Sequence, residues 1–228
     1  RLKFMKRLRD PQEGCEWDLS QTYETVLPHT IEEVYEVADA IERKDYHNLK
    51  GELGDLLFQI VFYSQLSTEN SIFDFADVVD GICQKMIRRH PHVFNSPMQQ
   101  NHMIRESESW EEIKQRERAE ECPEYDSVLD GLAKTFPSLS MAVKLQQRAA
   151  SIGFDWTTIK PVIEKIEEEL EELCVEVDNK SEATKIQEEL GDLLFACVNL
   201  ARHLNINPEI ALRHANQKFE RRFRQVEV

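Results

Sequence analysis

The amino-acid sequence predicts an all-α fold built as a tandem duplication of one helical unit. Only 7 of the 228 residues are glycine, whereas Glu, Leu, Lys and Ala, which favour helices, are abundant. The block ELGDLLF occurs twice, at 52–58 and at 189–195. An acidic cluster precedes each copy of the block, so the pattern indicates duplication rather than a chance match.

Corresponding features of the two copies lie roughly 135 positions apart throughout the pattern. We therefore expect three segments. The first copy spans 1–105, a charged helix and linker span 106–130, and the second copy spans 131–228. At about 100 residues, each copy is long enough to bury a core of its own.

The first copy begins with a loop that leads into helices. Proline and glycine within 9–21 indicate a structured loop, and Pro28 is expected to precede the first helix. From Ile31 the apolar residues recur every three or four positions, which is typical of an amphipathic helix. The elements expected after it are a break at 48–51, a buried helix at 52–66 that is apolar on all sides, a helix at 75–89, a loop at 95–102 and a solvated helix at 106–121.

The second copy repeats this plan. A Gly-Phe-Asp-Trp loop at 153–156 corresponds to Gly-Cys-Glu-Trp at 14–17. Apolar residues spaced three or four apart predict an amphipathic helix from Ile163. A second buried helix at 189–204 and a basic helix around 217–222 follow it.

Composition limits the function. A net charge of −15 repels a nucleic-acid backbone and makes divalent cations the natural counter-charge. The five cysteines show no C-x-x-C spacing, which disfavours a disulfide framework and a zinc site. No apolar run approaches the roughly 20 residues needed to span a bilayer, and no signal-peptide pattern is present. We expect a cytoplasmic protein that binds neither nucleic acid nor membrane.

The two acidic clusters could each be a surface or a site. Glu32, Glu33 and Glu36 cover an arc of about 100° opposite the apolar face of their helix. A solvated acidic face explains this spacing as well as a binding site does. The second copy has its cluster at 168–172.

The following helix favours a site. Glu52 and Asp55 lie among leucine and aromatic residues on a helix expected to be buried, where an unpaired carboxylate costs several kcal/mol. Glu189 and Asp192 are placed in the same way. The sequence therefore predicts a four-carboxylate site in each copy: Glu169, Glu172, Glu189 and Asp192 in the second, and Glu33, Glu36, Glu52 and Asp55 in the first.

Oxygen ligands in i, i+3 pairs suit a hard octahedral cation, Mg²⁺ or Mn²⁺. Structural ion pairs are the alternative explanation for the buried acids. A ferritin-like di-iron site would need Glu-x-x-His, and no histidine of this chain has a glutamate three residues before it.

Basic residues near the second cluster predict a site for a triphosphate. The candidates are Lys165, Lys185, Lys218 and Arg222. The first copy has His29 in place of Lys165 and Asn48 in place of Lys185, so the second copy is the better equipped. Trp156 is a candidate for packing on a base, although a tryptophan before a helix is more often a packing anchor.

An ordered set of motifs runs through nearly the whole chain, at 14–18, 21–22, 32–36, 52–58, 89–94, 153–158 and 218–223. This set resembles that of MazG, a family of two-repeat, all-α nucleoside triphosphate pyrophosphohydrolases. Glu16 departs from the proline usual in the family, which puts the detail of that loop in doubt.

The resemblance implies a homodimer with a core like a four-helix bundle, Mg²⁺ dependence and a main hydrolytic site in the second repeat. It also implies hydrolysis of NTPs or dNTPs between the α and β phosphates to a monophosphate and pyrophosphate, in nucleotide-pool housekeeping or stress control. We expect Glu168 or Glu169 to orient or deprotonate the attacking water, while the metal, Lys218 and Arg222 neutralise the leaving group. Two alternatives remain: a regulator that binds nucleotides at this site without turnover, and a purely structural helical dimer.

Overall fold

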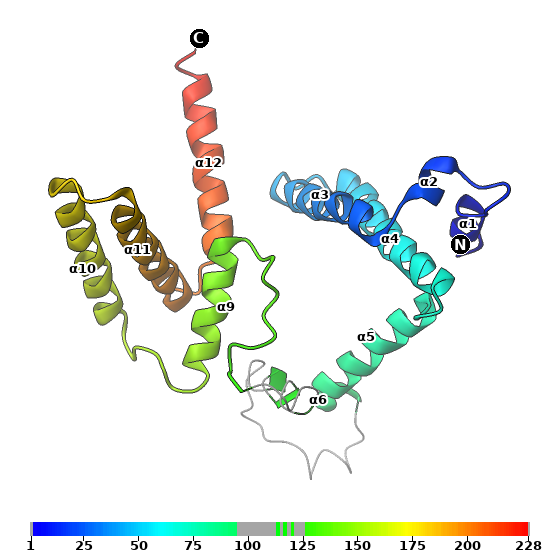
Figure 1. The fold of residues 1–228 in the computed structure, drawn as a ribbon, viewed down its shortest axis with the longest axis horizontal. Helices are drawn as coiled ribbons and strands as arrows, with labels where there is room; N and C mark the ends of the chain where they lie inside the picture. Colours follow the sequence, from blue (N-terminus) through cyan, green and yellow to red (C-terminus); the bar gives the residue numbers. More distant parts are fainter. Residues whose placement is uncertain (1, 95–112, 115, 118–119, 121–125, 228) are drawn as a thin grey trace. The chain divides into compact units, whose positions relative to one another are not determined.

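The computed structural model describes residues 2–94, 113–114, 116–117, 120 and 126–227 (Figure 1). Helices dominate these residues, and no strand occurs among them, so the predicted all-α class is confirmed. The chain divides into two compact units, residues 1–105 and 106–228. The loop predicted at 95–102 lies outside the described residues, as does most of the solvated helix predicted at 106–121.

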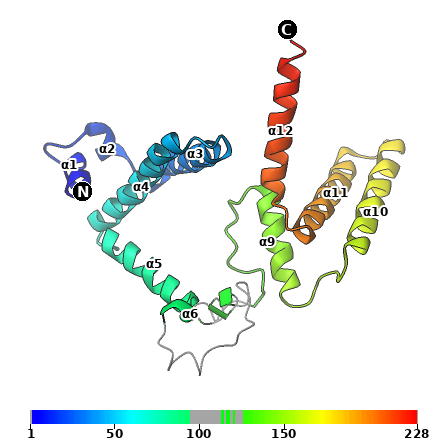
Figure 2. The same ribbon diagram turned by 180° about the vertical axis from the view of Figure 1, so that it is seen from behind.

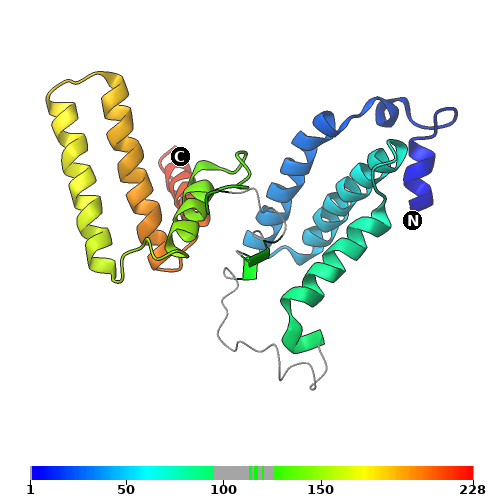
Figure 3. The same cartoon turned by 60° about the horizontal axis from the view of Figure 1, so that its bottom comes forward.

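The described helices of unit 1 are α1 (Leu2–Leu8), α2 (Glu16–Ser20), α3 (Tyr23–Glu42), α4 (Tyr46–Glu69), α5 (Phe75–Arg89) and α6 (Pro91–Phe94). The long helices α3 and α4 pack side by side as an antiparallel hairpin (Figure 3). α1 and α5 contact α4. α2 lies within the segment predicted to be a loop, so that prediction is only partly correct.

The core of unit 1 lies where α1 and α3 meet α4. Its fully buried members are Met5, Val26, Phe62 and Leu66. The guanidinium of Arg9 lies 5.2 Å from the centre of the Phe62 ring. Arg9 also donates to the carboxylate of Glu69 at 2.8 Å, which ties the segment after α1 to the end of α4.

The described helices of unit 2 are α9 (Ser138–Ala150), α10 (Ile159–Asp178), α11 (Ala183–His203) and α12 (Pro208–Arg224). α10 and α11 form a second antiparallel hairpin, which Figure 2 shows from behind. α9 packs on α11, and α12 packs on α9 and α11. The α10–α11 hairpin is therefore the counterpart of α3–α4, as the duplication requires.

α3 begins earlier than predicted. It starts at Tyr23, and Pro28 lies inside it rather than before it. The Thr22 hydroxyl accepts a hydrogen bond from the N–H of Thr25, whose hydroxyl accepts one from the N–H of Thr22. This reciprocal cap stabilises the helix start, and a proline in the second turn removes only one backbone donor.

α4 also begins earlier than predicted. The break expected at 48–51 lies inside it. The chain turns before Tyr46 instead, where Lys44 has a positive φ of 56° and the Asp45 side chain accepts from the N–H of Asn48. This cap fixes the helix start, and Gly51 is tolerated because a helical glycine costs only about 1 kcal/mol relative to alanine.

The second helix of each hairpin is not buried on all sides, contrary to the prediction. Leu53 and Leu57 on α4 are about half exposed, and so are Leu190 and Leu194 on α11. Within one chain, these helices have too few neighbours to cover an apolar surface that surrounds them. The homodimer that could cover it stays a prediction. Among the described helices, none is long and apolar enough to cross a lipid bilayer.

We expect Phe62→Ala to lower the free energy of unfolding by about 3–5 kcal/mol, because it empties the centre of the unit 1 core. Equilibrium urea unfolding followed by far-UV circular dichroism measures the loss. Ile72→Ala is the control, since Ile72 is 65% exposed and should cost less than about 0.5 kcal/mol. Equal losses in the two variants would contradict the assigned core.

Candidate functional site

The α10–α11 hairpin brings three carboxylates together. Glu169 on α10 and Glu189 and Asp192 on α11 each offer an oxygen within 4.8 Å of the others. Glu189 and Asp192 share a face of α11 because residues three apart are neighbours on a helix. The packing of the hairpin sets that face against Glu169. We call these three residues the second-repeat cluster.

Burial within the cluster differs from the expected pattern. Glu169 is 6% exposed, whereas Glu189 is half-buried and Asp192 is exposed. The sequence predicted that the acids of α11 are buried. It left two explanations for the acids of α10, a solvated helix face and a binding site. The solvated-face explanation fits the exposed Glu168 and Glu172, but it is wrong for Glu169.

Like charges crowd around Glu189. Its burial, followed by the charges of Glu172 and Asp192, raises the pKa of the Glu189 carboxyl above its ordinary value. Glu172 therefore acts on the cluster although it lies outside the tight group of three. The ionised acids repel one another, and a bound cation would relieve that repulsion.

Glu176 is a residue of this site that sequence reasoning missed. Its charge also acts on Glu189, and its Oε2 atom is buried without a hydrogen-bond partner among the described residues. It follows Glu169 by seven positions, so both lie on the same face of α10. The spacing is visible in the sequence but falls outside the repeated motif, because the first copy has Ala40 there. Crowded carboxylates with an unpaired buried oxygen fit a divalent cation.

Lys165 neutralises part of the acidic charge. Its ammonium lies 2.8 Å from Glu169 Oε1 and 2.9 Å from Glu168 Oε1. The carboxylates of Glu169 and then Glu168 raise the pKa of Lys165 above its ordinary value. The structure thus places this predicted phosphate-binding lysine at the cluster, where its present partners are carboxylates.

An apolar cavity of about 200 Å³ opens directly beside the cluster. Trp156 and Phe195 form part of its wall, and Lys165, Glu169 and Asp192 lie along its edge. Trp156 is 43% exposed, so its ring is not fully used in packing. The structure therefore places Trp156 at a cavity beside the cluster, and its contact with a base stays a prediction.

The other predicted basic residues lie on α11 and α12. Lys185 is exposed in the first turn of α11, four positions before Glu189 and therefore on the same face of the helix. Lys218 and Arg222 are exposed on α12, which packs on α9 and α11. In Figure 2 the upper half of α12 stands apart from α10. The structure therefore places Lys185 on the face of the cluster and does not bring α12 against α10.

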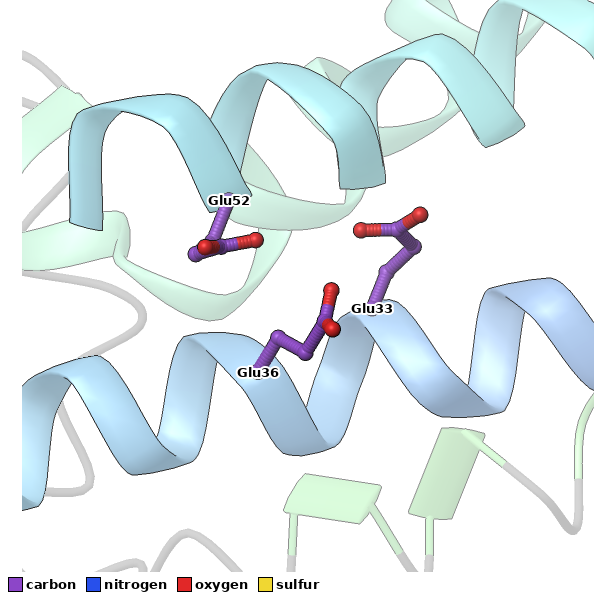
Figure 4. Close-up of side chains that lie close together, drawn as sticks. All are labelled: Glu33, Glu36 and Glu52. Carbon is purple, nitrogen blue, oxygen red and sulfur yellow. The ribbon is translucent and has the colours of Figure 1, made fainter. Parts of the chain in front are cut away.

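Unit 1 holds a matching acidic group. Oxygens of Glu33, Glu36 and Glu52 lie within 4.8 Å of one another, with the first two reaching from α3 toward α4 (Figure 4). Burial and then the charge of Asp55 raise the pKa of Glu33, and burial and then Glu52 raise that of Glu36. Glu33 Oε2 is buried without a partner among the described residues. We call Glu33, Glu36 and Glu52 the first-repeat cluster.

The neighbours of the first-repeat cluster are not lysines. Asn48 Nδ2 donates to Glu52 Oε1 at 2.8 Å, and His29 Nδ1 lies 3.8 Å from Glu32 Oε2. These residues correspond to Lys185 and Lys165 of the second copy. The two clusters therefore differ in the charge beside them and in one member. Unit 1 groups Glu36, which corresponds to Glu172, whereas the predicted ligand Asp55, which corresponds to Asp192, lies outside its group of three.

A duplicated helical hairpin with one acidic cluster in each copy defines an all-α protein whose grouped carboxylates could hold a metal ion. The model of the MazG nucleotide pyrophosphohydrolase domain matches the chain twice, over residues 21–94 and 157–227. The chain belongs to this family of enzymes, and the resemblance found in the sequence is confirmed.

Known relatives extend over nearly the whole chain. The nucleoside triphosphate pyrophosphohydrolase of Escherichia coli (strain K12) is 51% identical over 99% of this chain and 85% of its own length. The nucleoside triphosphate pyrophosphohydrolase/pyrophosphatase MazG of Thermotoga maritima is 43% identical over 99% of this chain and 84% of its own length. The uncharacterized protein YabN of Bacillus subtilis is 41% identical over 98% of this chain and 45% of its own length.

We expect Glu189→Gln to leave the melting temperature of the metal-free protein unchanged or higher. The raised pKa of Glu189 means that ionisation is less favourable in the folded than in the unfolded state. Stability is therefore lost as the pH rises from the ordinary carboxyl pKa through the raised one, and the amide removes that loss.

The same substitution should reduce any rise in melting temperature caused by Mg²⁺ binding to the folded state, because only the first-repeat cluster would remain to hold the ion. Differential scanning fluorimetry at several Mg²⁺ concentrations measures both effects. Glu188→Gln is the control, because Glu188 is exposed and outside the cluster. A Glu189→Gln variant that keeps the full Mg²⁺ response would contradict the assigned site.

Proposed function

We propose that this protein hydrolyses nucleoside triphosphates, NTPs or dNTPs, between the α and β phosphates, releasing a monophosphate and pyrophosphate. The observation that carries the proposal is the contact between the second-repeat cluster and the cavity of Trp156. Charged phosphates and an apolar base would then have adjacent places. The names of the relatives in E. coli and T. maritima support the substrate class.

A divalent cation fits the second-repeat cluster. Glu169, Glu172, Glu189 and Asp192 would hold Mg²⁺, or Mn²⁺ in its place, with Glu176 adding charge behind them. Oxygen-only ligands favour such hard cations. When bound, the ion neutralises charge on the phosphates and so stabilises the transition state.

Glu168 and Glu169 are the proposed catalytic residues. Glu168 is exposed and adjacent to the buried Glu169, so it can accept the proton of the attacking water while Glu169 holds the cation. Lys165, now paired with both carboxylates, would exchange them for substrate phosphates. Ammonium–phosphate contacts of this kind are strong because both partners are charged.

Lys185, Lys218 and Arg222 are proposed to neutralise the leaving pyrophosphate. Their exposure leaves the side chains accessible to a ligand. Since α12 packs on α9 and α11, Lys218 and Arg222 would serve the cluster only if α12 moved toward α10 or met the cluster of a second copy. A homodimer is also proposed, and the half-exposed leucines of both hairpins support it.

The second repeat is the proposed site of hydrolysis. In the first repeat, the side-chain amide of Asn48 donates a hydrogen bond to Glu52. His29 takes the position that corresponds to Lys165. The alternative is a regulator that binds nucleotides without turnover, which the same cluster would serve.

The cysteines Cys15, Cys83, Cys174 and Cys197 are free, which suits the proposed cytoplasmic location.

Incubation with dNTPs and Mg²⁺ is expected to give equal amounts of monophosphate and pyrophosphate, identified by ³¹P NMR. A chelator in excess of the metal should stop the reaction, and added Mg²⁺ should restore it. Orthophosphate and a diphosphate as products would contradict the proposed bond cleavage. Nucleotide binding without turnover would favour the regulator.

Glu172→Gln should lower kcat/KM by about 100-fold or more, because it removes a carboxylate proposed to hold the cation beside the reacting phosphates. Glu36→Gln is the matched substitution in the first repeat and should cost less than about threefold if that repeat contributes little. Steady-state kinetics of pyrophosphate release compare the two. Equal losses would refute the assignment to the second repeat.

A further inference from the structure

We propose that Gln146 and Asn199 recognise the edge of the substrate's nucleobase in a second cavity that adjoins the one shared by Trp156 and the carboxylates. This inference rests on the proposed function, since it assigns the base of the same substrate to this second cavity. It adds what that function leaves open: two polar side chains that read the base by hydrogen bonds.

A second cavity continues from the first. It has a volume of about 300 Å³, and Gln146, Asn199 and Arg202 contribute polar groups to a wall that is otherwise mostly apolar. Trp156, Phe195 and Asn199 line both cavities. The two cavities therefore share Trp156, Phe195 and Asn199 as a common wall, with the second-repeat cluster at the first cavity and Gln146 at the second. Flat apolar walls with a few polar groups at one end are typical of nucleobase sites.

Gln146 offers an unused acceptor. The residue is 7% exposed, and its Nε2 donates to the backbone carbonyl of Phe195 at 2.9 Å. A carbonyl oxygen can only accept, so the amide cannot be turned round without setting two oxygens against each other. Its Oε1 is then left buried without a donor among the described residues. An unsatisfied buried acceptor of this kind destabilises a protein that has no ligand bound.

Asn199 offers the complementary donor. It is 6% exposed, and its Oδ1 accepts from Arg202 at 3.0 Å and 2.7 Å. Arg202 is itself held by the carboxylate of Asp155 at 2.9 Å, next to Trp156 in the chain. Because the oxygen of Asn199 is engaged, its Nδ2 is the group available to a ligand. The pair thus presents one acceptor and one donor.

The first repeat supports a ligand role, because it lacks this polar end. The position of Asn199 is taken by Phe62, since each lies ten residues after the glutamate that opens the ELGDLLF block of its repeat. Phe62 is 1% exposed and fills the core of unit 1. Arg7 stands where Gln146 does when the Gly-x-x-Trp loops are matched. The buried position that holds Phe62 in the first repeat therefore holds the amide of Asn199 in the second. The second repeat is also the one with the lysines predicted to bind phosphate.

The chemistry of a base suits this pair. The hydrogen-bonding edge of each common nucleobase carries an N–H donor beside a nitrogen or oxygen acceptor. A base that enters the cavity would donate to Gln146 Oε1 and accept from Asn199 Nδ2, while Trp156 and Phe195 contact its faces. A site that makes such hydrogen bonds rejects a ligand unable to return them, because its buried polar groups stay unpaired.

The test compares a nucleotide with a substrate that has no base. We would measure kcat/KM for the four dNTPs and for 2-deoxyribose 5-triphosphate, using the full chain with Mg²⁺. Gln146→Met and Asn199→Leu each keep the side-chain size and remove the polar atoms. Each is expected to lose about 10-fold or more with at least one dNTP and less than twofold with the base-free triphosphate. Gln147→Met, which changes the neighbouring amide outside this cavity, should behave as wild type.

Equal losses on dNTPs and on the base-free triphosphate would overturn the inference, because the two amides would then only support the catalytic residues. No loss on any substrate would also overturn it. Melting temperatures show whether Gln146→Met or Asn199→Leu fails to fold. If one of them does, the kinetics of the other variant test the inference. If the wild-type protein hydrolyses no triphosphate, the proposed function fails. Binding of dNTP against 2-deoxyribose 5-triphosphate, measured by calorimetry with Ca²⁺, then tests base recognition separately.

Discussion

The contact between two antiparallel helices forces three carboxylates in each unit to within 4.8 Å of one another. Ionised groups this close repel one another, although solvent screens the repulsion where the carboxylates are exposed. The raised pKa values of Glu33, Glu36 and Glu189 express it, and in unit 2 Lys165 offsets part of it. A site that must be compensated by positive charge is thereby ready to accept a cation.

Most of the fold was predictable because its causes are local or periodic. Helix class, the duplication and the pairing of each acidic helix with an ELGDLLF helix follow from spacing alone. The boundaries near Pro28 and at 48–51 were wrong, because the caps at Thr22 and Asp45 outweigh the proline and glycine signals. The prediction that the second helix of each hairpin is buried was wrong for a different reason. Apolar residues around a helix indicate that its surface favours burial, but the neighbours that would bury it need not lie in the same chain.

The sequence predicted the carboxylates of the site better than the residues around them. Repetition identified Glu169, Glu189 and Asp192, since both copies carry them, but repetition cannot identify what only one copy has. Glu176, Gln146 and Asn199 are of that kind, so the comparison of the copies did not find them. The structure places Glu176 near Glu189 and the two amides at the adjoining cavity. Lys218 and Arg222 show that repetition can also identify residues that do not meet the site within one chain. Their pattern recurs in both copies, but α12 packs on α9 and α11 and not on α10.

The two repeats have used one helix position in opposite ways. Phe62 closes the core of unit 1 and receives the guanidinium of Arg9 over its ring, so that unit gains packing energy and leaves no room there. Asn199 gives up that packing, keeps its oxygen on Arg202 and leaves a cavity beside Trp156. A buried amide and an open cavity both lower stability, and a ligand that fills the cavity and completes the hydrogen bonds would restore what they cost. If the two amides bind the base as proposed, duplication makes such an exchange tolerable, because the packed core of the first repeat can stabilise the fold while the second repeat keeps polar groups for a ligand.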